Sequence, residues 1–571
     1  MLSAMPLFNN NNAAMAQGYN GNNYYSQYPT DDKKYECRTG PFEGFFVSSV
    51  EFCKFNKFDK DDRKDDRDNK TGDKGPTGDK GLTGDKGLTG DKGLTGDKGP
   101  TGDKGLTGDK GPTGDKGETG DPGQPGNITG ICPSTTSLQL QLDPDVTGFV
   151  VTCAPDSQFV YVTWYDNSTS DGNTDIFFAR STDNGQTFSD PENISQSPSN
   201  SSSPQIAAQG NNVYVVWDET TEINANNFDF DIFFAFSTDN GQTFSTPDNI
   251  SQTTSGFGPQ IAAQGNNVYV VWVDSSLANS QIFFAFSTDN GQNFSTPDNI
   301  SDTTGGKANP QITSQDNNVY VVWRDFTASS TADILFTVST DNGQNFSPFE
   351  NLSQTTVGTA DPQITIQGNN VYVVWEQGTL VNGEIFFAFS TDNGQNFSTP
   401  DNISQTLDDS SVPQIAAQGN NVYLVWTDGT PSNFDIFFAF STDNGQNFST
   451  PDNISQNTGV SFRPQIAAQA NNVYISWQDN EPGVLDIFFA FSTDNGQNFS
   501  TPDNISETTG ASFDSQITIQ NNTIYVVWVD ATPGHFDIFF AFSTDNGQTF
   551  STPENISENI GDSLLPQLAT P

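Results

Sequence analysis

The chain has 571 residues and a formal net charge of −48, with one histidine, four cysteines and 33% hydrophobic residues. These values argue against a single globular domain and favour several segments of different physical class. No run of residues approaches the roughly 20 apolar positions that span a bilayer, so we expect no membrane insertion.

Residues 1–16 end in Ala-Met-Ala, which has the small-residue pattern of a signal-peptidase site. The preceding residues lack both the basic and the apolar regions of a signal peptide. Two alternatives stay open, a wrong or degenerate start and a chance resemblance. Residues 17–71 form a second segment, an N-terminal module followed by a mixed-charge linker.

The four cysteines, Cys37, Cys53, Cys132 and Cys153, lie in the first third of the chain. Their even number and short spacings favour two local disulfides, 37 with 53 and 132 with 153, and hence an oxidising, extracytoplasmic compartment. Four reduced thiols are the alternative. No CxxC spacing is present and the only histidine, His535, is far away, which argues against a zinc site.

Residues 72–128 are predicted to be a stalk. Glycine occupies every third position from Gly72 to Gly126, nineteen glycines in all. Only glycine fits at the axis of a collagen triple helix, and the alternative is a disordered glycine-rich linker. The segment resembles the collagen-like stalks of prokaryotic surface proteins. That resemblance implies a homotrimer with a stalk on the order of 150 Å long, at about 3.1 Å per residue.

Residues 129–571 repeat a unit whose most regular part is S-T-D-N-G-Q-[TN]-F. A period near 50 residues with strand-like content is typical of propeller blades. We therefore predict an all-β fold, an eight-bladed β-propeller of four-stranded blades. The third residues of the eight copies are Asp183, Asp239, Asp289, Asp341, Asp392, Asp443, Asp494 and Asp545.

The second unit shows how each blade is expected to divide. Its strands are predicted as "PQIAAQ", "NNVYVVW", "DIFFAFS" and "QTFSTPDNIS", and each unit has one tryptophan for the core. The C-terminal "LLPQLATP" repeats the start of a unit. We expect it to supply an innermost strand beside "FVVTCAP" of the first unit and so to close the ring.

The repeated motif resembles the Asp-box (BNR repeat) of sialidase-like propellers, S-x-D-x-G-x-[TS]-[WF]. The resemblance implies a hairpin between the third and fourth strands of each blade. Asn-Gly supplies the positive φ of a tight turn, and the Asp carboxylate can accept backbone N–H groups across it. The eight box aspartates are therefore expected to be structural.

One face of the propeller is predicted to bind a partner, because only the loops between the second and third strands vary appreciably in length. Acidic residues flank these loops. If the two strands pair there, like charges oppose one another, and a calcium-type cation would relieve the repulsion. The alternative is that they cap turns and solubilise the rim. The candidate cation ligands are Asp166, Asp175, Glu219, Asp231, Asp274, Asp325, Asp333, Asp428, Asp435, Asp479, Asp486, Asp530 and Asp537.

A periodic N-[IL]-S sequence follows each box. These are N-glycosylation sequons if the protein is exported, and otherwise only the consensus end of the fourth strand. The asparagines are Asn193, Asn249, Asn299, Asn351, Asn402, Asn453, Asn504 and Asn555.

From Ile131 onward there are 49 acidic side chains against four basic ones, which excludes nucleic acid as a partner. The resemblance to sialidases implies three arginines around a substrate carboxylate, an Asp acid/base and a Tyr–Glu pair. We expect Arg324 and Arg463 in loops of one face and Arg180 on the opposite face. Because the three cannot converge, the sequence predicts that the protein is not an enzyme.

The sequence therefore predicts an extracellular or cell-surface stalk-and-head protein. Its propeller is expected to bind a glycan or a protein partner, with Ca²⁺ as the candidate cofactor. An exo-α-sialidase-like glycoside hydrolase and a structural envelope component are the alternatives.

Overall fold

The computed structural model describes residues 158–571 except 169–171, 225–226, 254, 278, 302–303, 327–331, 380–381, 407, 430–432, 482, 532–533 and 559–560. Before them it describes only the backbone of two hairpins, β1 (Tyr35–Glu36) with β2 (Phe46–Val47) and β3 (Leu138–Leu142) with β4 (Phe149–Cys153). The contacts between residues divide the chain into two units. One unit is Gln17–Ser134, and the other consists of Met1–Ala16 and Thr135–Pro571. The predictions for residues 1–16, the stalk and the side chains of Cys37, Cys53, Cys132 and Cys153 lie outside the described residues. The predicted domain boundaries stay predictions.

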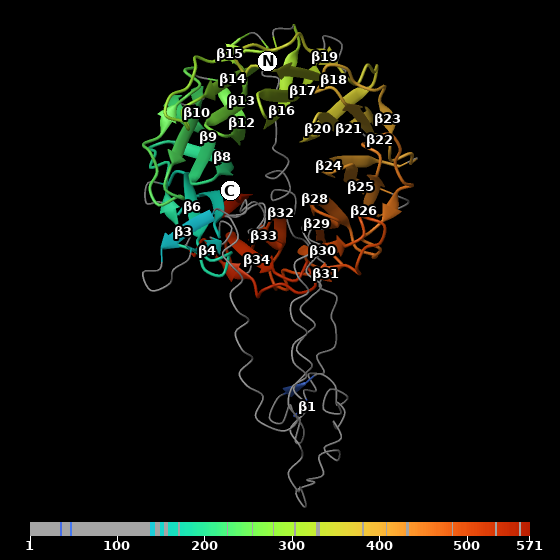
Figure 1. The fold of residues 1–571 in the computed structure, drawn as a ribbon. Helices are drawn as coiled ribbons and strands as arrows, with labels where there is room; N and C mark the ends of the chain where they lie inside the picture. The colour runs from blue at the N-terminus through green and yellow to red at the C-terminus, as the bar shows by residue number, and fades with distance from the viewer. Residues whose placement is uncertain are drawn as a thin grey trace, which may run out of the picture. The chain divides into compact units, whose positions relative to one another are not determined.

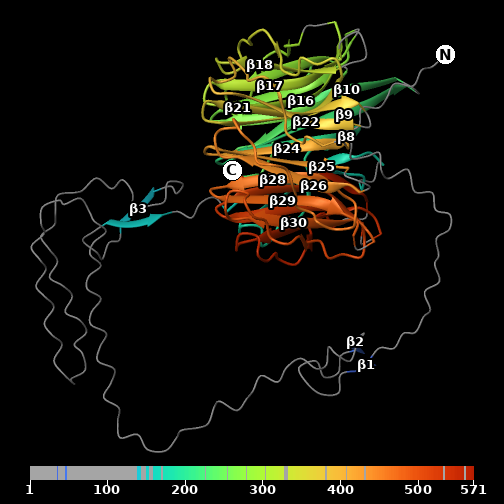
Figure 2. The ribbon, with the colours of Figure 1, turned by 90° about the vertical axis from the view of Figure 1, so that its right-hand side faces the viewer.

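Eight four-stranded antiparallel sheets are arranged around a central axis, which confirms the predicted eight-bladed propeller (Figures 1 and 2). The innermost strands are β36 (Ser563–Ala569), β8 (Asn200–Gln209), β12 (Gly256–Gln264), β16 (Gly306–Gln315), β20 (Gly358–Gln367), β24 (Ser410–Gln418), β28 (Ser461–Gln469) and β32 (Ser512–Gln520). The second strands are β5 (Val160–Asp166), β9 (Asn212–Asn224), β13 (Asn267–Asp274), β17 (Asn318–Phe326), β21 (Asn370–Thr379), β25 (Asn421–Asp428), β29 (Asn472–Asp479) and β33 (Thr523–Asp530).

The outer half of each blade follows the same order. The third strands are β6 (Asp175–Ser181), β10 (Asn227–Ser237), β14 (Gln281–Ser287), β18 (Ala332–Ser339), β22 (Asn382–Ser390), β26 (Asp435–Ser441), β30 (Asp486–Ser492) and β34 (Asp537–Ser543). The outermost strands are β7 (Glu192–Asn193), β11 (Asp248–Asn249), β15 (Asp298–Asn299), β19 (Glu350–Asn351), β23 (Asp401–Asn402), β27 (Asp452–Asn453), β31 (Asp503–Asn504) and β35 (Glu554–Asn555). We number the blades from 1 (β36, β5, β6, β7) to 8 (β32 to β35).

The outermost strands are shorter than the sequence predicted. Each has two residues and follows directly after a proline such as Pro247, except in blade 4, where Phe349 precedes β19. A proline has no N–H group to donate to the third strand, so it separates the two-residue strand from the earlier bond between Ser245 N and Phe236 O at 2.8 Å.

The C-terminus closes the ring. Strand β36 pairs antiparallel with β5, with Ser563 opposite Asp166 and Ala569 opposite Tyr161. The predicted role of the C-terminal segment is confirmed, but its predicted neighbour is wrong. The "FVVTC" residues form β4, which pairs with β3 and belongs to no blade.

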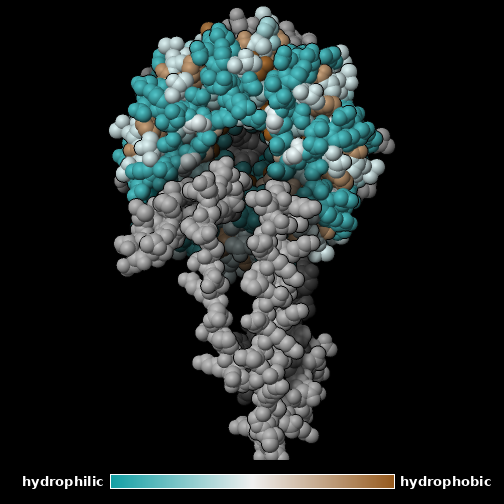
Figure 3. Space-filling model, viewed as in Figure 1, coloured by the Kyte–Doolittle hydropathy of each residue, from teal (hydrophilic) through white to brown (hydrophobic). Residues whose placement is uncertain are grey.

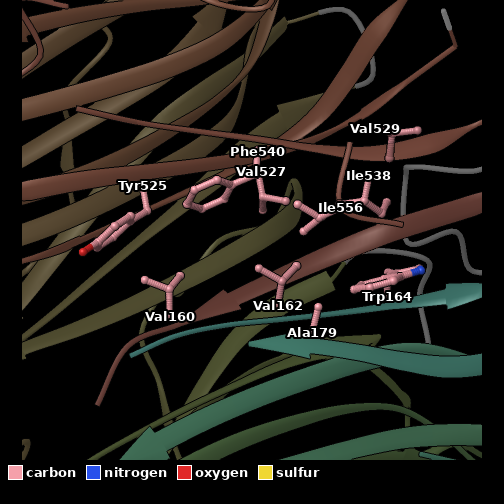
Figure 4. Close-up of a cluster of buried hydrophobic side chains, with 10 residues drawn as sticks. All are labelled: Val160, Val162, Trp164, Ala179, Tyr525, Val527, Val529, Ile538, Phe540 and Ile556. Atoms are coloured by element: carbon pink, nitrogen blue, oxygen red, sulfur yellow. The ribbon is translucent and has the colours of Figure 1, made fainter. Parts of the chain in front are cut away.

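The core is divided among the seams between neighbouring blades. Trp164, Val160 and Val162 of blade 1 pack against Tyr525 and Phe540 of blade 8 (Figure 4). All eight tryptophans are fully buried in the equivalent places, so the tryptophans serve the core. Because each apolar cluster is shared by two blades, no blade can bury its apolar surface alone. No helix in this described part of the chain is long and apolar enough to cross a membrane.

The box hairpin connects each blade to the one before it. In blade 2, Asp239 Oδ1 accepts hydrogen bonds from Ser237 Oγ at 2.7 Å and from Thr243 N at 2.9 Å. Burial acts to raise the pKa of Asp239, but these hydrogen bonds outweigh it and lower the pKa to about 2. A Cβ on Gly241 would lie 2.7 Å from Phe178 Cζ of blade 1. The box therefore holds a hairpin and also lets a neighbouring aromatic ring approach the backbone.

Candidate functional site

The innermost strand of every blade is interrupted by a β-bulge. In blade 2 the register with β9 shifts between Ser202 and Gln205, and the same shift recurs in the other seven blades. Each bulge has one residue in the left-handed region, with φ between 45° and 61°. These residues, which we call the bulge ring, are Ser203, Gly258, Asn309, Asp361, Val412, Arg463, Asp514 and Leu565.

The bulge of blade 3 shows how much room this position has. A Cβ built on Gly258 meets no atom within 4 Å. Glycine is therefore the relaxed choice at this position, whereas a side chain in the left-handed region costs roughly 1–2 kcal/mol. Seven of the eight blades nevertheless have a side chain there, and in blade 6 it is the β-branched Val412, the least favourable kind for positive φ.

A second set of residues lies beside the bulge ring. Each immediately follows a core tryptophan, and several contact the bulge residue of the next blade. Gln478 Nε2 donates to Asp514 Oδ1 at 3.3 Å, and Thr427 Oγ1 accepts from Arg463 N at 3.2 Å. This set, which we call the collar, is Tyr165, Asp218, Val273, Arg324, Glu376, Thr427, Gln478 and Val529.

These two sets differ strongly between repeats. Six different residues follow the tryptophan once, valine follows it twice, and the bulge ring repeats only aspartate. The positions that follow the bulge barely change, since seven bulges precede proline and all eight blades then have glutamine. Loop length and acidic flanking residues, on which the predicted binding face relied, do not contain this signal. A column-by-column comparison of the repeats would have found it.

The bulge ring encloses a cavity of about 210 Å³ at the channel mouth, between blades 4 and 8. Bulge residues of all five blades line it, together with the glutamines that lie two residues further along each inner strand and Gln478 of the collar. We call this cavity the mouth. Figure 3 shows the opposite face of the ring, on which the C-terminus lies, and this face is mostly hydrophilic.

One ion pair lies in the mouth. Arg463 Nη1 is 2.5 Å from Asp514 Oδ1, and the Asp514 side chain is almost fully buried. Burial raises the pKa of Asp514, and the Arg463 guanidinium opposes the rise. Burial also raises the pKa of Tyr165 to about 12, with further contributions from Asp514 and Asp562.

Arg324 of the collar lies in a second cluster of charged side chains. Burial lowers the pKa of Arg324, while Asp361 and Glu376 oppose the change, and its guanidinium lies 4.5 Å from the centre of the Phe326 ring. Burial raises the pKa of Glu376 to about 7, assisted by Asp361 and Asp409 and opposed by Arg324. A carboxyl group with this pKa can donate or accept a proton near neutral pH.

The arginines lie at the ends of the blades where they were expected, but two of them lie in strands and not in loops. Arg324 lies in β17 and Arg463 in β28, and not in loops, because the bulges allow the strands to continue past the mouth. Arg180 is at the other end of its blade, where Nη1 donates to Asn240 O of the box turn at 3.2 Å. Two arginines therefore reach the region of the mouth and the third does not.

The candidate cation ligands do oppose one another in register, as Asp166 does Asp175. Hydrogen-bond donors surround them. Asp175 accepts from Ser195 Oγ at 2.7 Å and from Asn193 Nδ2 at 2.8 Å, and Asp166 accepts from Ser563 Oγ at 2.5 Å. Across the described residues, no three His, Cys, Asp or Glu side chains converge as a metal site. Calcium binding by these pairs stays a prediction.

Blade 4 shows how one of these carboxylates is compensated by a charge. Lys307 is fully buried, and its Nζ is 3.3 Å from Asp325 Oδ2. The same repeat position is serine in other blades, where Ser410 and Ser512 donate to Asp428 and Asp530 at 2.8 and 2.7 Å.

The asparagines of the N-[IL]-S segments are half-buried and hydrogen-bonded. Asn504 Nδ2 donates to Asp486 Oδ2 at 2.9 Å, and Asn504 Oδ1 accepts from Ser506 Oγ at 3.2 Å. These amides thus help to satisfy the carboxylates at the loop end of the blade. Glycosylation of the sequons stays a prediction.

Two family models match the sequence. The collagen triple helix repeat matches residues 70–128, in 20 copies, and the BNR repeat-like domain matches residues 160–377. The predicted resemblance to collagen-like stalks and BNR propellers is therefore confirmed. No curated protein matches the chain.

Several solved structures are similar to the propeller. An ulvan lyase of polysaccharide lyase family PL25 is 13% identical, with a TM-score of 0.40, and the match covers 63% of this chain and 93% of that one. A Hadza microbial sialidase is 12% identical, with a TM-score of 0.32 and coverages of 69% and 90%. An α-L-arabinofuranosidase from Fusarium graminearum is 13% identical, with a TM-score of 0.34 and coverages of 53% and 92%.

The prediction that the protein is not an enzyme is wrong on this comparison, because the similar structures are themselves enzymes. The prediction relied on the absence of one arrangement of three arginines, which excludes a sialidase-type site and no other chemistry. At these identities the similarity shows the fold alone.

Proposed function

We propose that the propeller is the glycan-recognising head of an extracellular stalk-and-head protein, and that the glycan binds at the mouth. One observation supports this above all. The bulge position, which differs from blade to blade, converges there from five blades, and strained side chains are retained where glycine fits. Strained, diversified residues on a rigid scaffold are typical of binding sites.

The charge distribution of the propeller agrees with a carbohydrate ligand. The described propeller has very few basic residues, and Arg324 and Arg463 both have carboxylates beside them. Nucleic acid and anionic membrane surfaces are repelled by such a surface. Hydroxyl-rich ligands need only hydrogen-bonding groups, which the mouth supplies in its asparagine, glutamine and carboxylate side chains.

The collagen-like repeats are compatible with a trimer, and we propose that they hold three heads together outside the cell. If each head has one mouth, a surface with many copies of the glycan binds several heads at once. Avidity then raises the overall affinity above that of one mouth without any new contact.

The proposal predicts that filling the mouth abolishes glycan binding. The full-length protein is applied to an array of neutral and anionic glycans beside two variants of blade 6, Val412→Trp and Gln446→Trp. Val412 lines the mouth, whereas Gln446 is exposed in the box turn at the opposite end. We expect retention to fall at least 10-fold in Val412→Trp only, with both variants folded by circular dichroism. Equal retention by both would show that the mouth is not the site.

A second candidate function, cleavage of the bound glycan, is favoured by Glu376, which lies opposite Ala360 and so next to Asp361 of the mouth. Its pKa of about 7, raised by burial, suits a general acid or base beside the positively charged Arg324. On this candidate, incubation with a retained glycan produces new reducing ends, and Glu376→Gln slows their appearance roughly 100-fold or more while retention persists. An intact glycan after prolonged incubation with the wild-type protein would eliminate cleavage.

A further inference from the structure

The hydrogen-bonding groups of the mouth are of two kinds. The charged ones are engaged within the chain, since Arg463 pairs with Asp514 at 2.5 Å and Asp361 Oδ1 accepts from Asn309 Nδ2 at 3.2 Å. Among the uncharged ones, Gln478 and Ser515 also have partners, Asp514 at 3.3 Å and Ser476 at 3.1 Å. The other five are amides of one repeat position. They are Gln311, Gln363, Gln414, Gln465 and Gln516.

These five amides line the mouth without a partner from the chain. Within the part of the chain that the structure describes, none of their side-chain atoms takes part in a hydrogen bond. Each amide offers two N–H donors and one carbonyl acceptor. Five neighbouring blades thus direct a matched set of uncharged donors and acceptors at one small volume, and this set suits hydroxyl groups, which both donate and accept.

Another glutamine position of the repeat shows what a structural role would look like, although Gln205 and Gln260, at the position of the mouth glutamines in blades 2 and 3, line no part of the cavity. Further along the inner strands, Gln315 Nε2 donates to Gly368 O at 3.1 Å, and Gln469 Oε1 accepts from Asn522 N at 3.1 Å. Those amides connect neighbouring blades and are structural. The amides at the mouth make no such connection, so their hydrogen-bonding capacity is available to a ligand.

Charge and size restrict that ligand further. An anionic sugar would approach a propeller with a net charge of −45 and find the guanidinium of Arg463 already paired with a carboxylate. The cavity of about 210 Å³ is smaller than the roughly 300–1,000 Å³ of sites for drug-sized ligands. One sugar residue fits it, and the rest of a chain would remain outside.

We infer that the mouth takes the terminal residue of an uncharged glycan, whose hydroxyl groups bind the amides of these five glutamines. This inference rests on the proposed function and specifies its ligand class. It differs from recognition of a carboxylated or sulfated sugar, for which free positive charge would be needed.

The test uses the full-length protein and a matched pair of variants. Methyl glycosides of glucose, galactose, mannose and N-acetylglucosamine are titrated by calorimetry, beside methyl glucuronide and the methyl glycoside of sialic acid. Gln414→Ala removes an amide of the mouth. Gln260→Ala changes the same repeat position in blade 3, which does not line the cavity. Both positions are half-buried, so both variants are expected to fold.

We expect at least one neutral glycoside to bind and both anionic ones to fail. Gln414→Ala should weaken binding roughly 5-fold, the effect of about one hydrogen bond, and Gln260→Ala should leave it unchanged. Equal weakening by both variants would overturn the inference, because the mouth would not be the site.

The array of the proposed function separates the two possible failures. If anionic glycans are retained and neutral ones are not, the inference is wrong while glycan recognition stands. If neither class is retained and no glycoside binds, both fail. If Gln414→Ala melts at a lower temperature than the wild-type protein, Gln363→Ala replaces it, because this variant removes a neighbouring amide of the same mouth.

Discussion

Two glycines with nearly the same backbone conformation have different roles in this fold. Gly241 in the box of blade 2 has φ of 71°, and Gly258 in the bulge of blade 3 has φ of 61°. An added Cβ on Gly241 would lie 2.7 Å from the buried Phe178 ring, whereas one on Gly258 would meet nothing within 4 Å. The first glycine is needed for packing as well as conformation, and the second for conformation alone.

We therefore predict different costs for alanine at the two sites. Gly258→Ala should lower the free energy of unfolding by about 1 kcal/mol, from backbone strain offset by reduced freedom of the unfolded chain. Gly241→Ala should lower it by about 2–4 kcal/mol, because a rigid aromatic ring must also move. Urea unfolding followed by tryptophan fluorescence measures both. Equal losses would contradict the packing role of the box glycine.

At the scale of elements, blade 1 depends on β36, because its innermost strand comes from the far end of the chain. Leu564 and Leu568 of β36 pack against the cluster that joins blades 8 and 1. Ser563 also donates a hydrogen bond to the buried Asp166 of β5. Without β36 the edge of β5 and one side of this cluster would face solvent.

Deletion of residues 563–571 should destabilise the propeller by about 1.5–3 kcal/mol from the two half-buried leucines alone. Thermal melting measures the effect, and deletion of residues 570–571, which leaves β36 intact, is the control. Proteolysis is expected to begin in blade 1 of the shorter protein. A melting temperature within 2 °C of the control would show that β36 does not close the ring.

At the scale of the whole molecule, the stability of the propeller depends on pH through two sets of carboxyl groups, whose contributions change in opposite directions. Asp239 of the box has a pKa of about 2, below its usual value, so its stabilisation is present above about pH 4 and lost on further acidification. Burial raises the pKa of Glu376 to about 7 and of Asp218 to about 6. Their contribution is complete below about pH 4 and lost as the pH rises through these values.

The melting temperature should therefore be highest between roughly pH 4 and 5 and fall on both sides. Glu376→Gln should flatten the fall toward neutral pH, and Asp239→Asn should flatten the fall toward acid. Scanning fluorimetry from pH 2.5 to 8 measures both effects. Acidification also weakens the repulsion between the charges of a chain with a net charge of −48. The variant Glu376→Gln removes only the pH dependence that Glu376 causes, so it separates this effect from the general repulsion. A melting temperature that rises steadily from pH 5 to 7 would contradict the prediction.

The sequence by itself determined whatever depends on short, repeated patterns. The box spacing and one tryptophan per unit gave eight blades, and glycine at every third position gave the stalk resemblance. Hydrophobic periodicity and turn chemistry act over a few residues, so a single unit contains the information, and repetition confirms it.

Only the tertiary structure decided where function is proposed. Asp361, Val412, Arg463 and Asp514 are about 50 residues apart in the chain, and the bulges and the closed ring bring them to one cavity. The proline after seven of the eight bulges indicates an irregular strand, but the left-handed residue is different in nearly every blade, so no local pattern predicts which side chains meet. Packing between neighbouring blades fixes which side chains meet, and such packing depends on contacts between residues that are distant in sequence.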